Sequence, residues 1–174
     1  NPTDSWPTIE QGYVSIILNA KKYVYIETPY FLPTESVLFA MRTAALSGVD
    51  VRLMLPLHND SQIVQWATMS YVMETVEAGV KVILYKSGFN HSKILVSDDS
   101  LASCGSLNVD IRSFEHDFEC NAFFYDKDMA LRLKKVFTDD ERDCVPLEDV
   151  KDLTNRTFLQ RLWESLVRLL SPLM

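Results

Sequence analysis

Four side chains that lie close together in the sequence have the chemistry needed to act on a phosphate ester. His91 and Lys93 stand two residues apart at the start of HSKILVSDDSLASCGSLN, and Ser106 and Asn108 stand at its end. A histidine can attack phosphorus or pass a proton, and a lysine beside it can hold phosphate oxygens. Asn108 offers amide donors and Ser106 offers a hydroxyl to the same oxygens. The stretch therefore predicts phosphodiester chemistry without a metal ion or other cofactor.

The local structure expected around these residues brings the histidine and the lysine together. Residues 93–97 and 101–103 are predicted to be strands joined by a turn. Because side chains alternate along a strand, His91 and Lys93 are expected on one face and Asp98 on the opposite face. Asp98 is therefore expected to fix the turn, without direct contact with phosphate.

Two further residues are expected to support the site. Gly105 precedes Ser106, and a glycine there permits a close approach of the backbone. Glu119 lies in FECNAFF, an otherwise apolar stretch that is predicted to be a strand. A buried carboxylate needs a partner, and a catalytic histidine needs an acceptor at its second ring nitrogen. Glu119 is therefore the candidate partner of His91.

Periodic apolar residues, separated by proline and glycine, predict alternating helices and strands. Helices are expected at residues 9–20, 34–47, 60–78, 128–137 and 155–170, and further strands at 22–28, 49–55, 80–85 and 118–125. This order predicts an α/β fold in which a mixed β-sheet is flanked by helices on both faces. The acidic stretch 138–152 is expected to lead to the last helix, so residues 1–174 are expected to form a single domain.

The composition argues against some classes of protein. Lys and Arg total 17 against 24 Asp and Glu, a net charge of −7, whereas a nucleic-acid binder needs a basic surface. The three cysteines show no C-x-x-C spacing, which gives no indication of a disulfide framework or a zinc site. Cys104 and Cys120 lie in apolar runs and are expected to be small core residues.

The last predicted helix is amphipathic. Apolar residues recur along it at a spacing of four, whereas Arg161, Glu164 and Arg168 fall on the other side. Packing of the apolar face on the domain core, or on a missing part of the protein, is the first interpretation. An interfacial position on a membrane is the second. No apolar run reaches the ~20 residues that span a bilayer.

Other polar residues near these elements are expected to have ordinary structural roles. His58 and His116 are interpreted as loop histidines, and Asp110 and Arg112 as a structural ion pair. Tyr30 follows a strand end, where α/β proteins often bind ligands, but core packing explains it equally well.

The motif H-x-K-x-x-x-x-D, followed after six residues by G-S-x-N, resembles the signature of the phospholipase D superfamily. The text VDIRSFEHDFE after it resembles the bacterial cardiolipin synthase branch. Upstream, YVYIETPYFLPTESVLFAMRTAALSGVDVRLMLP resembles the opening of that branch's second catalytic half. The resemblance extends from about Trp6 to the last helix and implies a C-terminal fragment of a longer protein with two motifs.

The resemblance also implies a mechanism and partners. Members of the family face two motifs across a pseudo-twofold axis, so His91 would act as general acid and base opposite a nucleophilic histidine of the N-terminal catalytic half. The family's acidic residue at the position of Glu119 orients the motif histidine. The implied reaction condenses two phosphatidylglycerol molecules to cardiolipin and glycerol at the bacterial cell membrane. The missing N-terminal part would carry the membrane contact, and nucleic acid is not expected as a partner.

Two alternatives to this reading stay open. One is a homodimeric phosphodiesterase or endonuclease with a single motif, against which the charge of −7 argues. The other is a half that docks lipid without catalysis, against which the complete set His91, Lys93, Ser106, Asn108 and Glu119 argues.

Overall fold

A seven-stranded mixed sheet forms the centre of the structure, a computed structural model that describes residues 5–169 and 171. The strand order is β8-β6-β5-β1-β3-β4-β9. The strands are β1 (Tyr23–Glu27), β3 (Asp50–Pro56), β4 (Lys81–Tyr85), β5 (Ile94–Ser97), β6 (Leu101–Gly105), β8 (Asn121–Phe124) and β9 (Cys144–Pro146). Strands β1, β3 and β4 are parallel, and the remaining pairs are antiparallel. Two short strands, β2 (Phe31–Leu32) and β7 (Val109–Asp110), pair separately.

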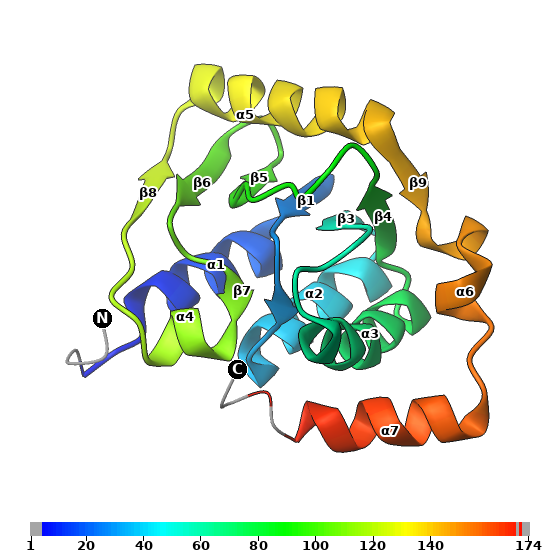
Figure 1. The fold of residues 1–174 in the computed structure, drawn as a ribbon. Helices are drawn as coiled ribbons and strands as arrows, with labels where there is room; N and C mark the ends of the chain where they lie inside the picture. The colour runs from blue at the N-terminus through cyan, green and yellow to red at the C-terminus, as the bar shows by residue number, and fades with distance from the viewer. Residues whose placement is uncertain (1–4, 170, 172–174) are drawn as a thin grey trace.

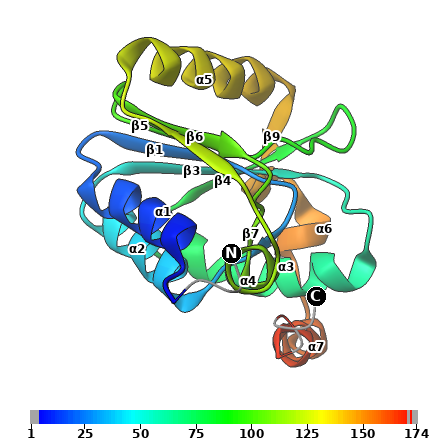
Figure 2. The ribbon, with the colours of Figure 1, turned by 90° about the vertical axis from the view of Figure 1, so that its left-hand side faces the viewer.

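Helices cover both faces of the sheet, which confirms the predicted fold class (Figure 1). On one face lie α1 (Thr8–Asn19), α2 (Glu35–Leu46) and α3 (Gln62–Glu77), and on the other lies α5 (Lys127–Asp140) (Figure 2). The short helices are α4 (Ile111–Glu115) and α6 (Lys151–Thr154). The last helix, α7 (Phe158–Arg168), packs on α3 and lies outside the helix layer (Figure 2).

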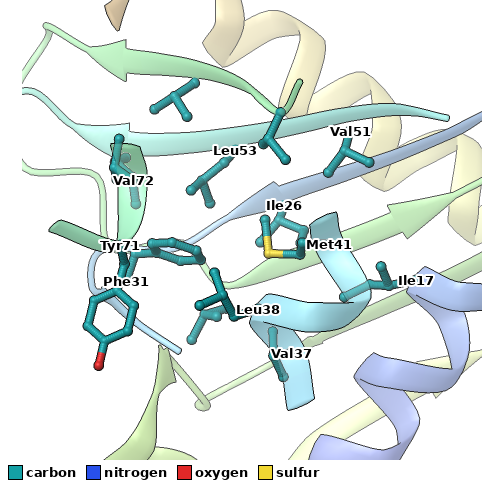
Figure 3. Packing of buried hydrophobic residues seen from close by; sticks show 14 of the residues in the cluster. Ile17, Ile26, Phe31, Val37, Leu38, Met41, Val51, Leu53, Tyr71 and Val72 are labelled. Carbon is teal, nitrogen blue, oxygen red and sulfur yellow. The ribbon is translucent and has the colours of Figure 1, made fainter. Parts of the chain in front are cut away.

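The two faces of the sheet have cores of different size. The larger core lies between the sheet and α1–α3, where Ile26 and Leu53 of the sheet pack with Met41 and other side chains of the helices (Figure 3). The smaller core lies under α5 and contains Tyr25 and Phe137, whose rings stack with their centroids 4.9 Å apart. Removing these apolar groups from water is the main source of the domain's stability.

One edge of the sheet collects the chain segments that carry the predicted site. The strands β1, β3, β4 and β6 run toward this edge, whereas β5 and β8 start from it. The segment before β5, the segment after β6 and the segment before β8 are therefore neighbours there. In open α/β sheets this carboxyl edge is where ligands bind.

Three predicted elements differ from the structure. The strand expected at 118–125 covers only Asn121–Phe124, because the residues before it form an irregular segment. The helix expected at 155–170 begins at Phe158 with a Thr157 capping box, and residue 170 lies outside the described residues. The acidic stretch 138–152 contains β9, which pairs with β4, together with the short helical turns Glu141–Asp143 and Leu147–Asp149.

Candidate active site

His91 and Lys93 meet at the carboxyl edge of the sheet. They lie in the connection that precedes β5, not on a regular strand as the alternation argument predicts, because β5 begins at Ile94. The Lys93 Nζ lies 3.2 Å from Nδ1 and 3.4 Å from Nε2 of His91. Lys93 also donates a hydrogen bond of 2.9 Å to the His91 carbonyl oxygen, which holds the ammonium beside the ring.

Aromatic rings form one wall of this pair. The imidazole of the exposed His91 lies 5.7 Å from the Phe89 ring and 6.3 Å from the Tyr30 ring, measured between centroids. The Tyr30 hydroxyl donates a hydrogen bond of 2.6 Å to Asp60, which lies just before α3. Burial and the Asp60 carboxylate raise the pKa of Tyr30 to about 12, so its hydroxyl stays protonated at neutral pH.

The surroundings of Lys93 make it a ready ligand for an anion. Partial burial lowers the pKa of its ammonium, although Glu119 and Asp110 oppose this effect. A phosphate placed beside Lys93 would bring a negative charge close to the ammonium and so favour its protonated form. The lysine is thus half-buried, directed at His91 and incompletely neutralised.

The segment after β6 is held against the segment before β8. A side chain at Gly105 would collide with the Cys120 carbonyl oxygen and with the Asn121 side chain, which explains the glycine. The Asn121 side chain accepts a hydrogen bond of 3.2 Å from the Leu107 amide. The Ser106 amide donates one of 3.0 Å to the Cys120 carbonyl oxygen.

Glu119 pairs with Ser106. The Ser106 hydroxyl donates to the Glu119 carboxylate and accepts a hydrogen bond of 3.0 Å from the Cys120 amide. Within the described residues, Glu119 forms no hydrogen bond with His91, although its charge acts on Lys93. The expectation that Glu119 lies inside a buried strand is wrong, since it is only half-buried and precedes β8.

The cysteines also differ from their predicted places. Cys120 is exposed and Cys104 is half-buried, so neither is the small core residue that the apolar runs indicated. The irregular segment before β8 turns Cys120 toward the surface.

Asn108 borders a pocket of about 320 Å³. Its side-chain nitrogen, Nδ2, donates a hydrogen bond of 3.3 Å to the Ser113 hydroxyl. Its side-chain oxygen, Oδ1, is buried and has no hydrogen-bond partner among the described residues. An unpaired buried acceptor is costly unless a ligand or water satisfies it. The pocket is also lined by Tyr30, Asp60, Arg112 and Asp117, among others.

The predicted ion pair between Asp110 and Arg112 is wrong. Arg112 pairs with Asp117 at 3.2 Å, whereas Asp110 caps α4 by accepting a hydrogen bond of 2.6 Å from the Ser113 amide. The Asp110 carboxylate is thus directed at the first turn of α4, and the Arg112 guanidinium is directed at Asp117.

Asp98 lies at the far end of β5 from His91. Its carboxylate accepts three backbone hydrogen bonds, from the amides of Lys21 at 2.6 Å and of Lys22 and Tyr23 at 2.9 Å. Burial acts to raise the pKa of Asp98, but these amides outweigh it and lower the pKa. Asp98 and Asp99 have φ angles of 53° and 56°, the left-handed conformation that a tight hairpin turn requires.

Glu27 is a residue of the site that the sequence reasoning missed. It ends β1, is 2% exposed and accepts a hydrogen bond from the Asn90 side chain. Asn90 in turn accepts one of 2.9 Å from the Ser92 amide, so Glu27 fixes the segment that carries His91. A signal was present, since Glu27 is a lone carboxylate in the apolar run KYVYIET.

The environment of Glu27 also changes its ionisation. Burial raises its pKa to about 7, and the nearby Asp140 carboxylate adds to the effect. The second carboxylate oxygen of Glu27 is buried and without a partner in the described part of the chain. The group therefore titrates near neutral pH directly beneath the His91 segment.

Residues 5–169 and 171 contain neither a cluster of metal-binding side chains nor a membrane-spanning helix. No group of three or more His, Cys, Asp or Glu side chains there is arranged to hold a metal ion. No helix in the same part of the chain has the length and apolar character needed to cross a bilayer.

Known structures share this fold. The crystal structure of Nuc, a phospholipase D family member from Salmonella typhimurium, matches with a TM-score of 0.67 at 19% identity, over 78% of this chain and 88% of that one. Phosphatidylserine synthase from Haemophilus influenzae matches with a TM-score of 0.75 at 16% identity, over 95% of this chain and 44% of that one.

Sequence comparison gives a closer relationship. The "Cardiolipin synthase" of Geobacillus thermodenitrificans is 45% identical over 173 residues, and the "Major cardiolipin synthase ClsA" of Bacillus subtilis is 44% identical over 178 residues. Each alignment covers 99% of this chain but only 34% and 36% of the relative, so the chain spans about a third of their length. The family model for the cardiolipin synthase, PLD-like domain matches residues 13–141. This chain therefore belongs to the family of PLD-like domains of cardiolipin synthase.

Proposed function

We propose that this chain supplies the second half of a cardiolipin synthase active site. The observation that carries the proposal is the Lys93 ammonium, which lies within 3.4 Å of both ring nitrogens of the exposed His91. The identity of 44–45% to cardiolipin synthases supports a phospholipid as the substrate. The net charge of −7 argues against nucleic acid.

The proposed reaction has two phosphoryl-transfer steps. A histidine of the other catalytic half attacks the phosphorus of phosphatidylglycerol, the bond from phosphorus to the glycerol head group breaks, and His91 gives its proton to the departing glycerol. A hydroxyl of a second phosphatidylglycerol then loses its proton to His91 and attacks the phosphohistidine. The phosphorus–nitrogen bond breaks, which yields cardiolipin and returns both histidines to their starting states.

The remaining residues are assigned by their contacts. Lys93 and the Asn108 amide hold the non-bridging phosphate oxygens, where they oppose the charge that develops in the transition state. Ser106 and Glu119 form a hydrogen-bonded pair, and the charge of Glu119 favours the charged form of Lys93. The pocket next to Asn108 offers carboxylates and the Arg112 guanidinium to the hydroxyls of a glycerol head group.

The proposed partners follow from the half site. The N-terminal catalytic half of the same protein provides the nucleophile, and the part of the protein beyond this chain holds the enzyme at the bacterial cell membrane. The curated relatives are about three times as long as the aligned region, which leaves room for both.

The role of His91 is tested with an activated substrate. In the full-length protein, His91→Ala should release one equivalent of nitrophenol from phosphatidyl-p-nitrophenol and then stop, because this leaving group needs no proton but the second step still needs a base. The matched control His116→Ala, an exposed turn histidine, should turn over normally. Absence of the burst in His91→Ala would show instead that His91 is the nucleophile.

The half-site proposal is tested with the 174-residue chain alone. It should convert little phosphatidylglycerol to cardiolipin, and activity should return when the separately expressed N-terminal part is added. Full activity of the purified chain as a monomer would contradict the proposal.

A further inference from the structure

The last helix presents its apolar face to solvent instead of to the domain. Six apolar residues of α7 and its C-cap are 47–78% exposed: Phe158, Leu159, Leu162, Trp163, Leu166 and Leu169. The buried residues of the helix are Glu164 and Val167. The first interpretation of the sequence is packing on the domain core or on a missing part of the protein, and the domain core is wrong.

Polar contacts fix the rotation of α7. Arg156 and Glu164 form an ion pair whose side chains are 6% and 8% exposed. Arg168 pairs with Glu74 of α3 at 2.8 Å, and its guanidinium lies 3.9 Å from the centre of the Tyr71 ring. Charged and cation–π contacts of this kind hold a helix in one orientation. The outward direction of the apolar face is thus built into the contact with α3.

The exposed residues form a continuous stripe. At 100° per residue, Phe158, Leu162, Leu166 and Leu169 lie within about 80° of one another, with Leu159 and Trp163 adjoining them. The stripe contains no charged residue. A contiguous apolar stripe on the exposed side of a helix marks a surface that contacts another protein or a membrane.

We propose that α7 lies in the membrane interface and inserts this stripe among the acyl chains of phospholipids. The choice of a lipid surface rests on the proposed function, whose substrate is itself a membrane lipid. Leucines together with one Trp and one Phe are the composition of interfacial helices. Arg161 is exposed at the flank of the stripe, where it can reach anionic head groups.

The position of α7 argues against the other catalytic half as the occupant of the stripe. A half that meets His91 must approach the carboxyl edge of the sheet. Helix α7 lies on the outer side of α3, which separates it from the sheet (Figure 2). Its buried side already faces α3, and Trp163 at the edge of the stripe contacts the Trp66 ring of that helix. The rest of the stripe points away from the domain.

Site-specific photocrosslinking identifies the occupant directly. A benzoylphenylalanine at position 162 of the full-length protein, in vesicles of phosphatidylglycerol and phosphatidylethanolamine, should give adducts with phospholipid. The same group at Leu131, an exposed position on α5 that is 39% accessible, should give none. Adducts with peptides of the other half, or with a second copy of the chain, would overturn the proposal, as would the absence of any adduct.

The result does not depend on catalysis. Lipid adducts at position 162 should persist in a His91→Ala background, so failure of the proposed reaction would leave this test intact. Conversely, a normal nitrophenol burst without lipid adducts would reject the membrane role of α7 alone.

A kinetic measurement provides the second test. Leu162→Glu combined with Leu166→Glu should slow cardiolipin formation on vesicles by about tenfold or more, because two apolar side chains leave the bilayer. The rate with a dispersed short-chain phosphatidylglycerol should not change, and neither should either rate in the control Leu131→Glu. Equal losses on both substrates, or no loss on vesicles, would refute the interfacial role.

Discussion

His91 and Asp98 belong to one short motif, and the fold holds them in opposite ways. His91 is exposed in an irregular segment, and its ring contacts Lys93 and two aromatic neighbours. Asp98 lies in a tight turn, where three backbone amides bind its carboxylate. Strand β5 joins the two and pairs with β1 and β6 on its two sides.

One short motif thus contains both an exposed imidazole, at His91, and a carboxylate with a structural role, at Asp98. An exposed imidazole with few partners can change its protonation and its contacts during a reaction. A carboxylate held by three amides is fixed in one position, where it ties the β5–β6 turn to the start of β1. The motif therefore specifies a strand that is anchored at the Asp98 end and presents the exposed His91 beside Lys93 at the other.

The largest expected effect is on turnover. In the full-length protein, His91→Ala or Lys93→Ala should lower the rate of cardiolipin formation by roughly 10²- to 10⁴-fold. The free energy of unfolding should change by less than about 0.5 kcal/mol, because both residues make few packing contacts. Lipid product analysis and chemical denaturation measure the two quantities. Near-normal synthesis by either variant would contradict the assignment.

Substitutions of Asp98, at the other end of the motif, should lower stability and leave turnover unchanged. Asp98→Ala should lower the free energy of unfolding by about 3 to 4 kcal/mol, since three amides lose a charged acceptor. Asp98→Asn should lose less, because asparagine tolerates the left-handed conformation and keeps one acceptor oxygen. Turnover per folded molecule should be unchanged. A loss of turnover without a loss of stability would place Asp98 among the reacting groups.

Glu27 sharpens the comparison because it supports the His91 end. Its pKa rises from 4.5 to about 7 on folding, so the folded state favours the protonated carboxyl. The stabilisation of the folded state by the protonated Glu27 carboxyl is fully present below pH 4.5 and is lost as the pH rises through 7. Glu27→Gln should therefore stabilise the protein by up to roughly 3 kcal/mol above pH 7, with the difference vanishing toward pH 4.5.

Denaturation curves of wild type and Glu27→Gln across this pH range measure the difference. The Asp140 carboxylate acts on the pKa of Glu27, so Asp140→Asn serves as the reference for its share. A stability difference that does not vary with pH would reject the buried titration.

The smallest effect is expected at the neighbour of Asp98. Lys134 of α5 forms a 2.7 Å ion pair with Asp99 and lies 4.4 Å from the centre of the Tyr23 ring. Both charged groups are about one-third exposed, so Lys134→Ala should cost only about 0.5 to 1 kcal/mol of stability. A loss as large as that of Asp98→Ala would mean that α5, more than the amides, holds the turn.

The fold class was predictable from the sequence because the relevant signals are local. Apolar periodicity with glycine and proline stops gave the alternation of helices and strands, including the β1–α2–β3–α3–β4 unit. Strand β9 was missed because three residues in an acidic stretch have no period, and their pairing with β4 is a long-range contact. The proximity of His91 and Lys93 was predictable from their spacing, even though β5 begins at Ile94, three residues after His91.

The failures at the site have one physical origin. A lone carboxylate in an apolar run indicates a buried acid only when the run is a strand. This holds for Glu27 in β1 and fails for Glu119, which precedes β8. The outward direction of the apolar face of α7 was also not predictable from local sequence. It depends on the ion pair between Arg168 and Glu74, a residue far away in the sequence.

Helix α5 links strands that lie at opposite edges of the sheet. It follows β8 at one edge, crosses the face and leads through one helical turn into β9 at the other edge (Figure 1). The smaller core and the ion pair between Lys134 and Asp99 hold it on the sheet. In hydrogen-exchange terms, lifting α5 releases both edges together, so the amides of β8 and β9 should exchange with one common opening free energy. The two most distant strands of the sheet would then behave as a single cooperative unit, while the central strands that carry the motif stay closed.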